Sequence, residues 1–462
     1  MAIKEEKKGR LLITGSGSGS GKTTAVCGIL YGLRRLGLQA AAFKCGPDYI
    51  DPMFHQRVLG IESGNLDLFF SDADTVCELL EQGMQHADIG IIEGAMGYYD
   101  GIGMTSQASA YAVSQATHTP AVLVVNPVGM GASVLALIQG FLNYHTPSGI
   151  EGILFNQVSE KRYQTLKRET EKLGISVLGY LPKQKAFTLE SRHLGLVTAP
   201  EIEKFSEKLE QFYELIKDTI DWQALLALAR SVSDTPKKQK AYPPAHREYE
   251  LTIAVARDEA FCFLYADNLR YLESRGCKLC YFSPIHDTEL PKQADGIILC
   301  GGYPELYAKA LSANKQMRTQ IREALQNGLP CIAECGGFLY LQKELTDMDG
   351  ESHPMTGFLD GRGFRGKGLE RFGYVEVCAK KLFGRENLHF RAHEFHYFDC
   401  DSAGEDLWIK KASAESAWQG GKTGDSFYAG FPHVYFYGNE TFAQAYLDCA
   451  ARYGKDRRIE SI

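Results

Sequence analysis

A glycine- and serine-rich segment, GSGSGSGKTT at 15–24, restricts the possible folds of this chain more than any other feature. The apolar run LLIT (11–14) leads directly into it, and a helical pattern begins at Lys22. In such a unit, glycine backbone lets several N–H groups converge on phosphate oxygens at a helix N-terminus, which favours anions. A flexible linker would need neither GKTT nor the flanking strand and helix. The segment therefore predicts a nucleotide-binding loop on a parallel α/β sheet.

The loop residues have predicted tasks that follow from phosphate chemistry. Lys22 would reach the β- and γ-phosphates, and the Thr23 hydroxyl would bind Mg²⁺. We expect ATP to contact Gly17, Ser18, Gly19, Ser20, Gly21, Lys22, Thr23 and Thr24. The usual spacing would place glycine at position 16, where this chain has Ser16, so that Gly15 leads the loop. This longer loop resembles that of the dethiobiotin synthetase branch of phosphate-loop proteins more than that of the GTPases.

Carboxylates follow two further strand candidates. Asp48 lies in the turn KCGPDYIDP, and Glu93 ends the strand in IIEGAMGYYDG. Because ligands bind at the carboxyl edge of parallel sheets, we predict that Thr23, Asp48 and Glu93 hold the metal. Taken alone, each acid would be a helix cap or a solvated loop residue. The metal role stays open for Asp51 and Asp100.

The order of apolar and helical segments predicts two domains. Strand candidates in the first half are LLIT, QAAAF, DIGIIE, AVLVVN and GILFN, which indicate a parallel sheet with helices on both faces. Asn156 ends the last of them, where its amide could read the adenine ring or form a turn. An amphipathic helical stretch at 201–231 precedes a polar, proline-bearing linker at 233–248. We predict two doubly wound α/β domains, a phosphate-loop domain at 1–232 and a second one at 249–462.

The segment CIAECGGFLYL at 331–341 has the pattern of a strand, a cysteine, two glycines and a helix. A nucleophile at a sharp strand-to-helix turn needs small neighbours, because its backbone is strained and the next N–H must face the substrate. Cys335 is therefore the predicted nucleophile, and the helix N-terminus would favour its thiolate. The predicted oxyanion donors are the backbone N–H groups of Gly336 and of Gly302, which follows the strand GIILC.

A cysteine nucleophile needs a histidine base that is close in space. Among the 12 histidines, His433 follows a Gly/Pro turn late in the second domain, the position that a class I glutamine amidotransferase would use. His393 and His396 in RAHEFHYF are rivals. HEFH lacks the HExxH zinc spacing, and residues three apart on a strand face opposite sides, so we interpret these two as structural or substrate-contacting residues.

Composition argues against several other classes of protein. The net charge of −7 disfavours a general nucleic-acid binder, which needs a basic surface. No apolar run is long enough to span a bilayer, and MAIKEEKKGR lacks the apolar core of a signal peptide. The 12 cysteines lack the dense spacing of a disulfide framework. We expect a cytoplasmic protein that binds neither nucleic acid nor membrane, and a homodimer stays open.

Together these motifs resemble the cobyrinic acid a,c-diamide synthase family across essentially the whole chain. The matching stretches are GSGSGSGKTT, KCGPDYIDP, IIEGAMGYYDG, SRHLGL, IAVARDEAFCFLY, GGYPELY, AECGG and HEFHYF. The resemblance implies a dethiobiotin-synthetase-like ATP domain joined to a class I glutamine amidotransferase domain. It implies amidation of the a and c acetates of a corrin-type macrocycle through an acyl phosphate, with ATP, Mg²⁺ and L-glutamine. Cobyrinate is the favoured substrate, and hydrogenobyrinate or nickel sirohydrochlorin are the alternatives.

The family's motifs imply further roles. Residues near the transferring phosphoryl group or the macrocycle would be Tyr49, Asp51, Asp100, Arg192 and His193. Many amidotransferases of this class carry glutamate two residues after the histidine, but this chain has Tyr435 there, so the orienting partner of His433 is unassigned. An alternative of another class is a nucleotide-switch protein with an inactive amidotransferase fold. The intact Cys335 and His433 argue against it.

Overall fold

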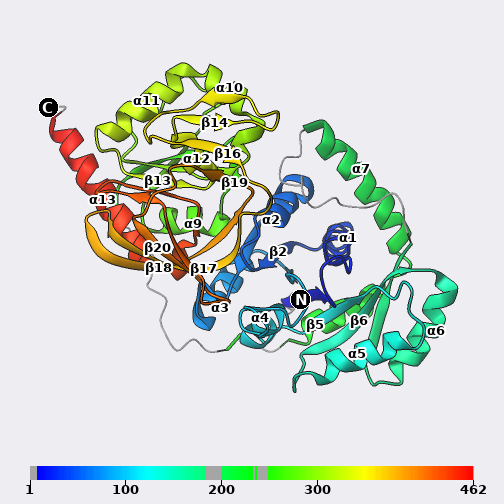
Figure 1. Cartoon of the computed structure of the whole chain (residues 1–462). Helices are drawn as coiled ribbons and strands as arrows, with labels where there is room; N and C mark the ends of the chain where they lie inside the picture. The colour runs from blue at the N-terminus through cyan, green and yellow to red at the C-terminus, as the bar shows by residue number, and fades with distance from the viewer. Residues whose placement is uncertain (1–7, 184–198, 233–234, 237–247, 461–462) are drawn as a thin grey trace, which may run out of the picture. The chain divides into compact units, whose positions relative to one another are not determined.

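The chain folds into two compact units, Met1–Tyr242 and Pro243–Ile462 (Figure 1). The computed structural model describes residues 8–183, 199–232, 235–236 and 248–460. Each unit contains a largely parallel sheet with helices packed on it, so the predicted α/β class is confirmed. The predicted linker at 233–248 lies mostly outside the described residues, and its bounds stay a prediction.

The first unit is built on a seven-stranded parallel sheet with the order β3-β2-β4-β1-β5-β6-β7. Its strands are β1 Gly9–Gly15, β2 Ala40–Cys45, β3 Ser63–Leu66, β4 Ile89–Glu93, β5 Ala121–Val125, β6 Ile150–Val158 and β7 Ser176–Pro182. The sequence predicted five of these strands and missed β3 and β7. β3 has the sequence SGNL, which has no apolar run. Because parallel strands align their carboxyl ends, the loops after β1, β2 and β4 meet at one edge.

Helices pack on this sheet, and α1 packs closely against α7 and α8. The helices are α1 Lys22–Arg35, α2 Ile50–Phe54, η1 His55–Leu59, α3 Ala73–Gly83, α4 Ala110–Thr117, α5 Ser133–Asn143, α6 Glu160–Glu171, α7 Ala199–Ile216 and α8 Trp222–Arg230. The stretch predicted to be helical at 201–231 forms α7 and α8. Gly28 lies against the Phe212 ring of α7 and Gly32 against the Trp222 ring of α8, where a side chain on either glycine would collide.

The second unit contains a six-stranded sheet with the order β10-β8-β11-β13-β23-β22, parallel except at β22. Its strands are β8 Thr252–Ala256, β10 Lys278–Phe282, β11 Gly296–Leu299, β13 Cys331–Glu334, β22 Lys422–Thr423 and β23 Phe427–Gly430. A five-stranded antiparallel sheet has the order β21-β20-β17-β18-β24. Its strands are β17 Arg371–Leu382, β18 Arg385–His396, β20 Leu407–Lys411, β21 Ala417–Gly420 and β24 His433–Val434.

Shorter elements complete the second unit. The small strands are β9 Phe261–Phe263, β12 Gly301–Gly302, β14 Glu344–Thr346, β15 Ser352–Pro354, β16 Arg362–Arg365 and β19 Phe398–Cys400. The helices are α9 Ala266–Ser274, η3 Pro304–Leu306, α10 Ala308–Ala313, α11 Lys315–Gln326, α12 Gly336–Leu341, η4 Phe436–Gly438 and α13 Glu440–Glu460. No helix in the described part of the chain is long and apolar enough to cross a membrane.

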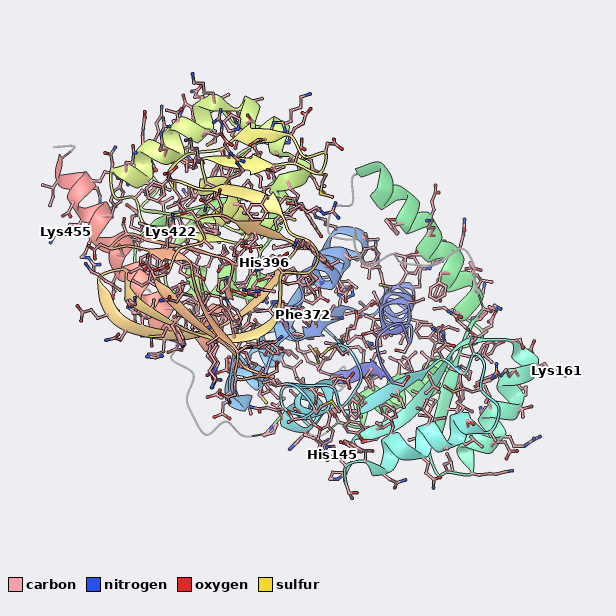
Figure 2. The ribbon with its side chains drawn as sticks, viewed as in Figure 1. His145, Lys161, Phe372, His396, Lys422 and Lys455 are labelled. Atoms are coloured by element: carbon pink, nitrogen blue, oxygen red, sulfur yellow. The ribbon has the colours of Figure 1, made fainter. Side chains whose placement is uncertain are left out.

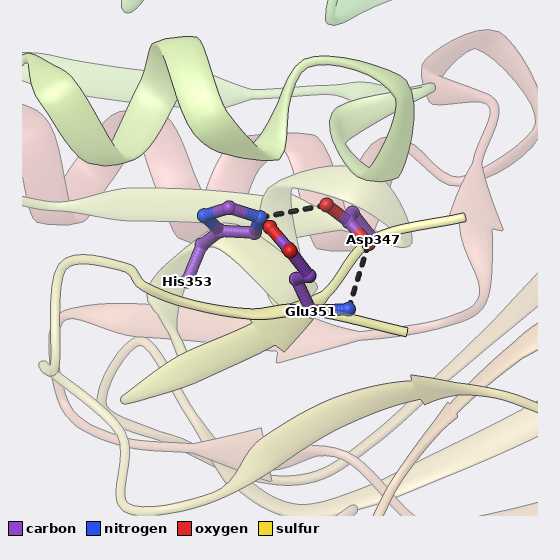
Figure 3. A group of neighbouring side chains, drawn as sticks. All are labelled: Asp347, Glu351 and His353. Carbon is purple, nitrogen blue, oxygen red and sulfur yellow. Dashed lines mark hydrogen bonds and ion pairs between the residues drawn. The ribbon is translucent and has the colours of Figure 1, made fainter. Parts of the chain in front are cut away.

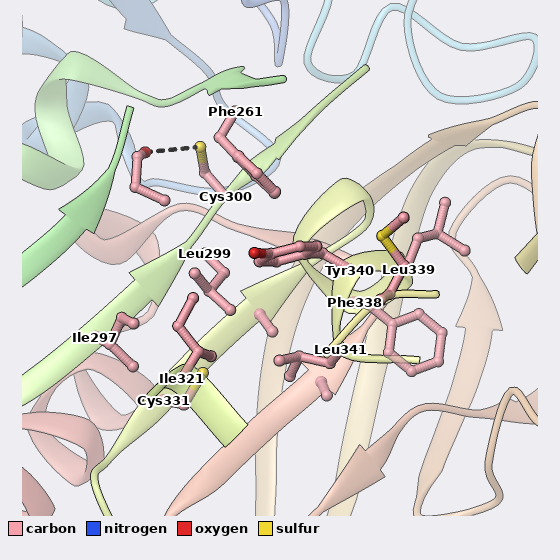
Figure 4. Close-up of a cluster of buried hydrophobic side chains, with 14 of the residues drawn as sticks. Phe261, Ile297, Leu299, Cys300, Ile321, Cys331, Phe338, Leu339, Tyr340 and Leu341 are labelled. Carbon is pink, nitrogen blue, oxygen red and sulfur yellow. Dashed lines mark hydrogen bonds between the residues drawn. The ribbon is translucent and has the colours of Figure 1, made fainter. Parts of the chain in front are cut away.

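A buried apolar cluster fixes α12 against the six-stranded sheet (Figure 4). Leu299 and Cys331 come from neighbouring parallel strands, while Phe338 and Tyr340 come from α12, and all four are fully buried. The helix therefore starts at a fixed point, directly after the end of β13.

The contact between Gly32 and Trp222 gives a test of the packing of α1. A Cβ atom at Gly32 would lie 2.0 Å from the Trp222 ring, so Gly32→Ala should lower the free energy of unfolding. We expect a loss of about 1–3 kcal/mol from overpacking, measured by urea unfolding. Gly140→Ala in α5 is the matched control, since a Cβ atom there meets nothing within 4 Å, and it should stabilise by about 1 kcal/mol. Equal effects of the two substitutions would contradict this packing.

Candidate functional site

The loop between β1 and α1 has the geometry of a phosphate cradle. Gly19 and Gly21 adopt positive φ angles of 77° and 97°, which favour glycine. A Cβ atom on Gly17 or Gly19 would meet nothing within 4 Å, so the backbone there borders open space. The Lys22 ammonium donates to the carbonyl of Gly17 at 2.9 Å and folds back over the loop. This arrangement fits the triphosphate of ATP.

The residues predicted to hold the metal lie close together at the carboxyl edge of the sheet. The Thr23 hydroxyl donates to Oε1 of Glu93 at 2.7 Å. Oδ1 of Asp48 accepts the Ile50 N–H at 2.8 Å, so this carboxylate also caps the first turn of α2. Hydroxyl and carboxylate oxygens are the donors that Mg²⁺ prefers, so this set fits the metal. Its binding stays a prediction.

Lys44, which the sequence analysis missed, lies at the centre of this site. Its ammonium is 2.5 Å from Oδ2 of Asp51, 3.0 Å from Oε1 of Glu93 and 3.8 Å from Oδ2 of Asp48. Burial alone would lower the pKa of Lys44, but Asp51 and Glu93 outweigh it and hold the pKa above its usual range. The signal was present in KCGPD, where Lys44 is a charged residue inside an apolar strand.

Burial and neighbouring charges shift the pKa values of the groups in this site in different directions. Burial, followed by the charge of Lys44, lowers the pKa of Lys22 to about 8. Burial and Asp51 raise the pKa of Glu93 to about 7, against the opposing effect of Lys44. Burial also acts to raise the pKa of Asp51, but the Lys44 ammonium outweighs it and the pKa falls below its usual value. Added phosphate or metal charge would therefore act directly on Lys22 and Glu93.

His55 lies next to Glu93, and the sequence analysis missed this residue as well. Its Nε2 is 3.7 Å from Oε2 of Glu93, and both side chains are fully buried. Burial lowers the pKa of His55 to about 4, so the ring is neutral near pH 7. Sequence alone gives no signal for this contact, because it joins η1 to the end of β4.

The other residues that the sequence predicted for the site in the first unit differ in their contacts and surroundings. The Asn156 amide donates to the carbonyl of Ser20 at 2.9 Å, so it holds the phosphate loop. Its contact with adenine stays a prediction. Oδ2 of Asp100 accepts the Gly97 N–H at 2.8 Å and stabilises its own turn, and Tyr49 is buried. The predicted residues Arg192 and His193 lie outside the described residues.

Cys335 lies at a strained turn, as the sequence predicted for a nucleophile. Its φ and ψ angles are 47° and −100°, which cost about 1–3 kcal/mol in a residue with a side chain. The turn is held because the Cys335 N–H donates to Gly430 O at 2.7 Å and its carbonyl accepts from Leu339 N–H at 2.9 Å. A Cβ atom on Gly336 would lie 3.0 Å from the Gly302 nitrogen, so the two predicted oxyanion residues are neighbours.

His433 is the histidine that lies against this turn. A Cβ atom on Gly301 would be 2.5 Å from Cε1 of His433, so the ring packs on bare backbone. Burial lowers the pKa of His433, but a hydrogen bond with Cys335 and the carboxylate of Glu334 raise it more, to about 10. Oε2 of Glu334 is 3.4 Å from Nδ1 of His433. The sequence analysis missed Glu334, which it treated as the end of a strand.

The rival histidines have other surroundings. His393 is the cross-strand partner of His433, and burial followed by the His433 charge lowers the pKa of His393 to about 3. His396 lies within the second unit (Figure 2). Its ring stacks on Phe431 with centroids 3.9 Å apart. Its Nδ1 donates to Phe398 O at 2.6 Å. These contacts hold the His396 ring in place, and its interpretation as a structural or substrate-contacting residue stays a prediction.

A separate acidic group lies at the turn between β14 and β15 (Figure 3). Asp347, Glu351 and His353 place ligand atoms within 4.8 Å of one another. Oδ1 of Asp347 accepts the Glu351 N–H at 2.9 Å, and its Oδ2 lies 2.7 Å from Nε2 of His353. These bonds stabilise the turn, and we assign the group no metal.

Comparison with known proteins matches the two halves of the chain separately. Residues 11–197 match the CobQ/CobB/MinD/ParA nucleotide binding domain, and residues 252–440 match the CobB/CobQ-like glutamine amidotransferase domain.

Relatives resemble the chain over nearly its whole length. A cobyrinate a,c-diamide synthase of Caldanaerobacter subterraneus is 37% identical over 96% of this chain and 99% of that protein. Proteins of the same name from Clostridium acetobutylicum and Listeria monocytogenes are each 38% identical. They cover 94% and 93% of this chain, and 98% and 97% of their own lengths.

The buried Lys44 gives a prediction for the protein without nucleotide or metal. Lys44→Met leaves Asp51 and Glu93 buried without their cation. The free energy of unfolding, measured with urea, should therefore fall by about 3–5 kcal/mol. Lys167→Met is the control, because Lys167 pairs with Glu171 at 3.8 Å on the surface, and it should change stability by less than about 1 kcal/mol. A Lys44 variant as stable as this control would show that the ammonium does not offset the buried carboxylates.

Proposed function

Since the chain belongs to the cobyrinate a,c-diamide synthase family, we propose that it amidates the a and c acetate carboxylates of cobyrinate with ATP and glutamine. One observation carries the proposal: a phosphate loop beside buried carboxylates and a cysteine–histidine–glutamate cluster occur in the same chain. A nucleotide switch would not need the second cluster.

The first half-reaction activates the carboxylate. A carboxylate oxygen of the macrocycle attacks the γ-phosphorus of ATP, and ADP leaves, which gives an acyl phosphate. Lys22 stabilises the charge on the phosphates. Thr23, Asp48 and Glu93 would hold Mg²⁺, which neutralises phosphate charge when it is bound. Lys44 keeps the carboxylate of Asp51 ionised beside them.

The second half-reaction supplies ammonia. Cys335, whose proton lies on His433 because the pKa of His433 is raised to about 10, attacks the side-chain amide of glutamine through its sulfur, and His433 then passes this proton to the leaving ammonia. Water then hydrolyses the thioester to glutamate and frees the thiol. Ammonia attacks the acyl phosphate, and phosphate leaves from the new amide. The N–H groups of Gly302 and Gly336 would stabilise the oxyanions at the thioester step.

The macrocycle is tested directly by its products. The protein is incubated with Mg²⁺, ATP, glutamine and, separately, cobyrinate, hydrogenobyrinate or nickel sirohydrochlorin. With cobyrinate we expect two successive acid-to-amide mass changes, at a higher rate than with the other two. Faster amidation of another macrocycle would replace cobyrinate as the substrate, and no amidation of any of them would contradict the proposal.

The nucleophile gives a separate prediction. Cys335→Ser should reduce glutamine-dependent amidation by about 10³-fold or more, because the hydroxyl is a far weaker nucleophile at neutral pH. Amidation with free ammonium should persist, because it needs the phosphate site alone. Cys331→Ala is the matched control, since Cys331 is buried within β13 and should leave glutamine use intact. Loss of both activities in a folded Cys335 variant would contradict separate sites.

A further inference from the structure

The strand that carries His433 is too short to fix this residue by sheet pairing. β24 spans His433–Val434 and pairs with Ala392 and His393 of β18. A two-residue strand paired along one edge leaves backbone groups on its other edge, and buried backbone groups need partners. The position of a catalytic ring on such a strand therefore depends on what satisfies that second edge.

Buried side chains provide these partners. The Val434 N–H donates to Oε1 of Glu334 at 3.0 Å, and the Val434 carbonyl accepts from the Asn268 amide at 2.8 Å. The Phe436 N–H donates to Oδ1 of the same Asn268 at 2.8 Å. Side chains from β13 and α9 therefore bind both backbone groups of Val434, the residue after His433. These bonds fix the main chain next to the His433 ring.

The second oxygen of Glu334 faces the histidine ring itself. Oε2 lies 3.4 Å from Nδ1 of His433, and the two side chains are 8% and 2% exposed. This distance is long for a hydrogen bond, but catalytic hydrogen bonds are often long before substrate binds and tighten in the substrate complex. A buried carboxylate at Nδ1 also stabilises the imidazolium, since Glu334 is among the groups that raise the pKa of His433.

The position where related enzymes carry an acid is used for something else. Tyr435, two residues after His433, is fully buried, and its hydroxyl makes a hydrogen bond with Asp267. Asp267 in turn forms an ion pair with Arg270 of α9. Tyr435 therefore belongs to a different buried network and does not orient the ring.

We propose that Glu334, the residue directly before the nucleophile, is the positioning residue of His433 and takes the place of the acid absent at Tyr435. This inference rests on the proposed glutamine hydrolysis. One carboxylate then has two tasks: Oε1 holds the backbone beside His433, and Oε2 accepts Nδ1–H, which leaves Nε2 to exchange the proton with Cys335. Strand β13, which ends directly before the nucleophile Cys335, therefore also positions His433 as its base.

Other titratable groups surround the pair and define the background for any pH measurement. They are His393, Glu394 and His396 of β18, Tyr428 of β23 and Cys300 next to β11. Of these, His393, Glu394 and His396 interact with His433, whereas Tyr428 and Cys300 interact with Glu334. A variant at Glu334 leaves all of them in place.

The decisive variant is Glu334→Gln, which keeps an oxygen for the Val434 N–H and removes the charge. We expect kcat for glutamine hydrolysis to fall by about 10²-fold with little change in KM, because the proton transfer loses its oriented base. Removal of the carboxylate lowers the pKa of His433, so titration of the ring in histidine-labelled NMR should move to lower pH. Alkylation of Cys335 by iodoacetamide at neutral pH, followed by mass spectrometry, should slow.

Two further variants separate positioning from a general loss of structure. Glu334→Asp retains the charge on a shorter side chain and should give an intermediate kcat. Asp295→Asn is the matched control: Asp295 is also buried but lies at the opposite end of the parallel strands, directly before β11, where it pairs with Arg457 at 3.0 Å. It should leave the alkylation rate and the His433 titration unchanged.

The outcomes distinguish this inference from the proposed function. Wild-type kcat and an unchanged His433 titration in Glu334→Gln would overturn the positioning role, as would an equal effect of Asp295→Asn. Amidation with free ammonium should be normal in Glu334→Gln. If the wild-type protein itself fails to amidate the macrocycle with ammonium, the proposed function fails instead.

Discussion

Buried charge at the carboxyl edge of the first sheet is the constraint on which the synthetase site depends. An ammonium and two carboxylates cannot be buried there separately, because each would lose its hydration. Lys44, Asp51 and Glu93 are stable together because each satisfies the others at hydrogen-bonding distance. This network also fixes Glu93 beside Thr23, and therefore sets the position of any metal relative to the phosphate loop.

The second unit must also hold its functional residues in fixed positions, and it does so with hydrogen bonds. Cys335 needs a strained backbone to present its sulfur, and hydrogen bonds to Gly430 and Leu339 hold that strain. His433 is carried by a strand of two residues and needs side chains to hold it. Glu334 links these two requirements, since it lies in the strand that ends at the nucleophile and contacts both the ring and its backbone.

The sequence predicted the parts of the molecule that depend on local pattern. The phosphate loop, the turn at Cys335 and the α/β alternation are each encoded by consecutive residues with a backbone requirement. The sequence could not predict contacts between distant segments. Glu334 and Val434 are 100 positions apart, and Lys44 meets Glu93 across 49 positions. For Asn156, sequence pattern identified the position, but the fold directs its amide to the phosphate loop.

The central claim is that one chain couples the nitrogen of glutamine to a carboxylate activated by ATP. It is tested most directly with amide-labelled glutamine and no added ammonium, with cobyrinate, ATP and Mg²⁺. The account predicts label in both new amides, with one glutamate and one ADP formed for each amide. Unlabelled amides, or ADP formed without amide, would contradict it.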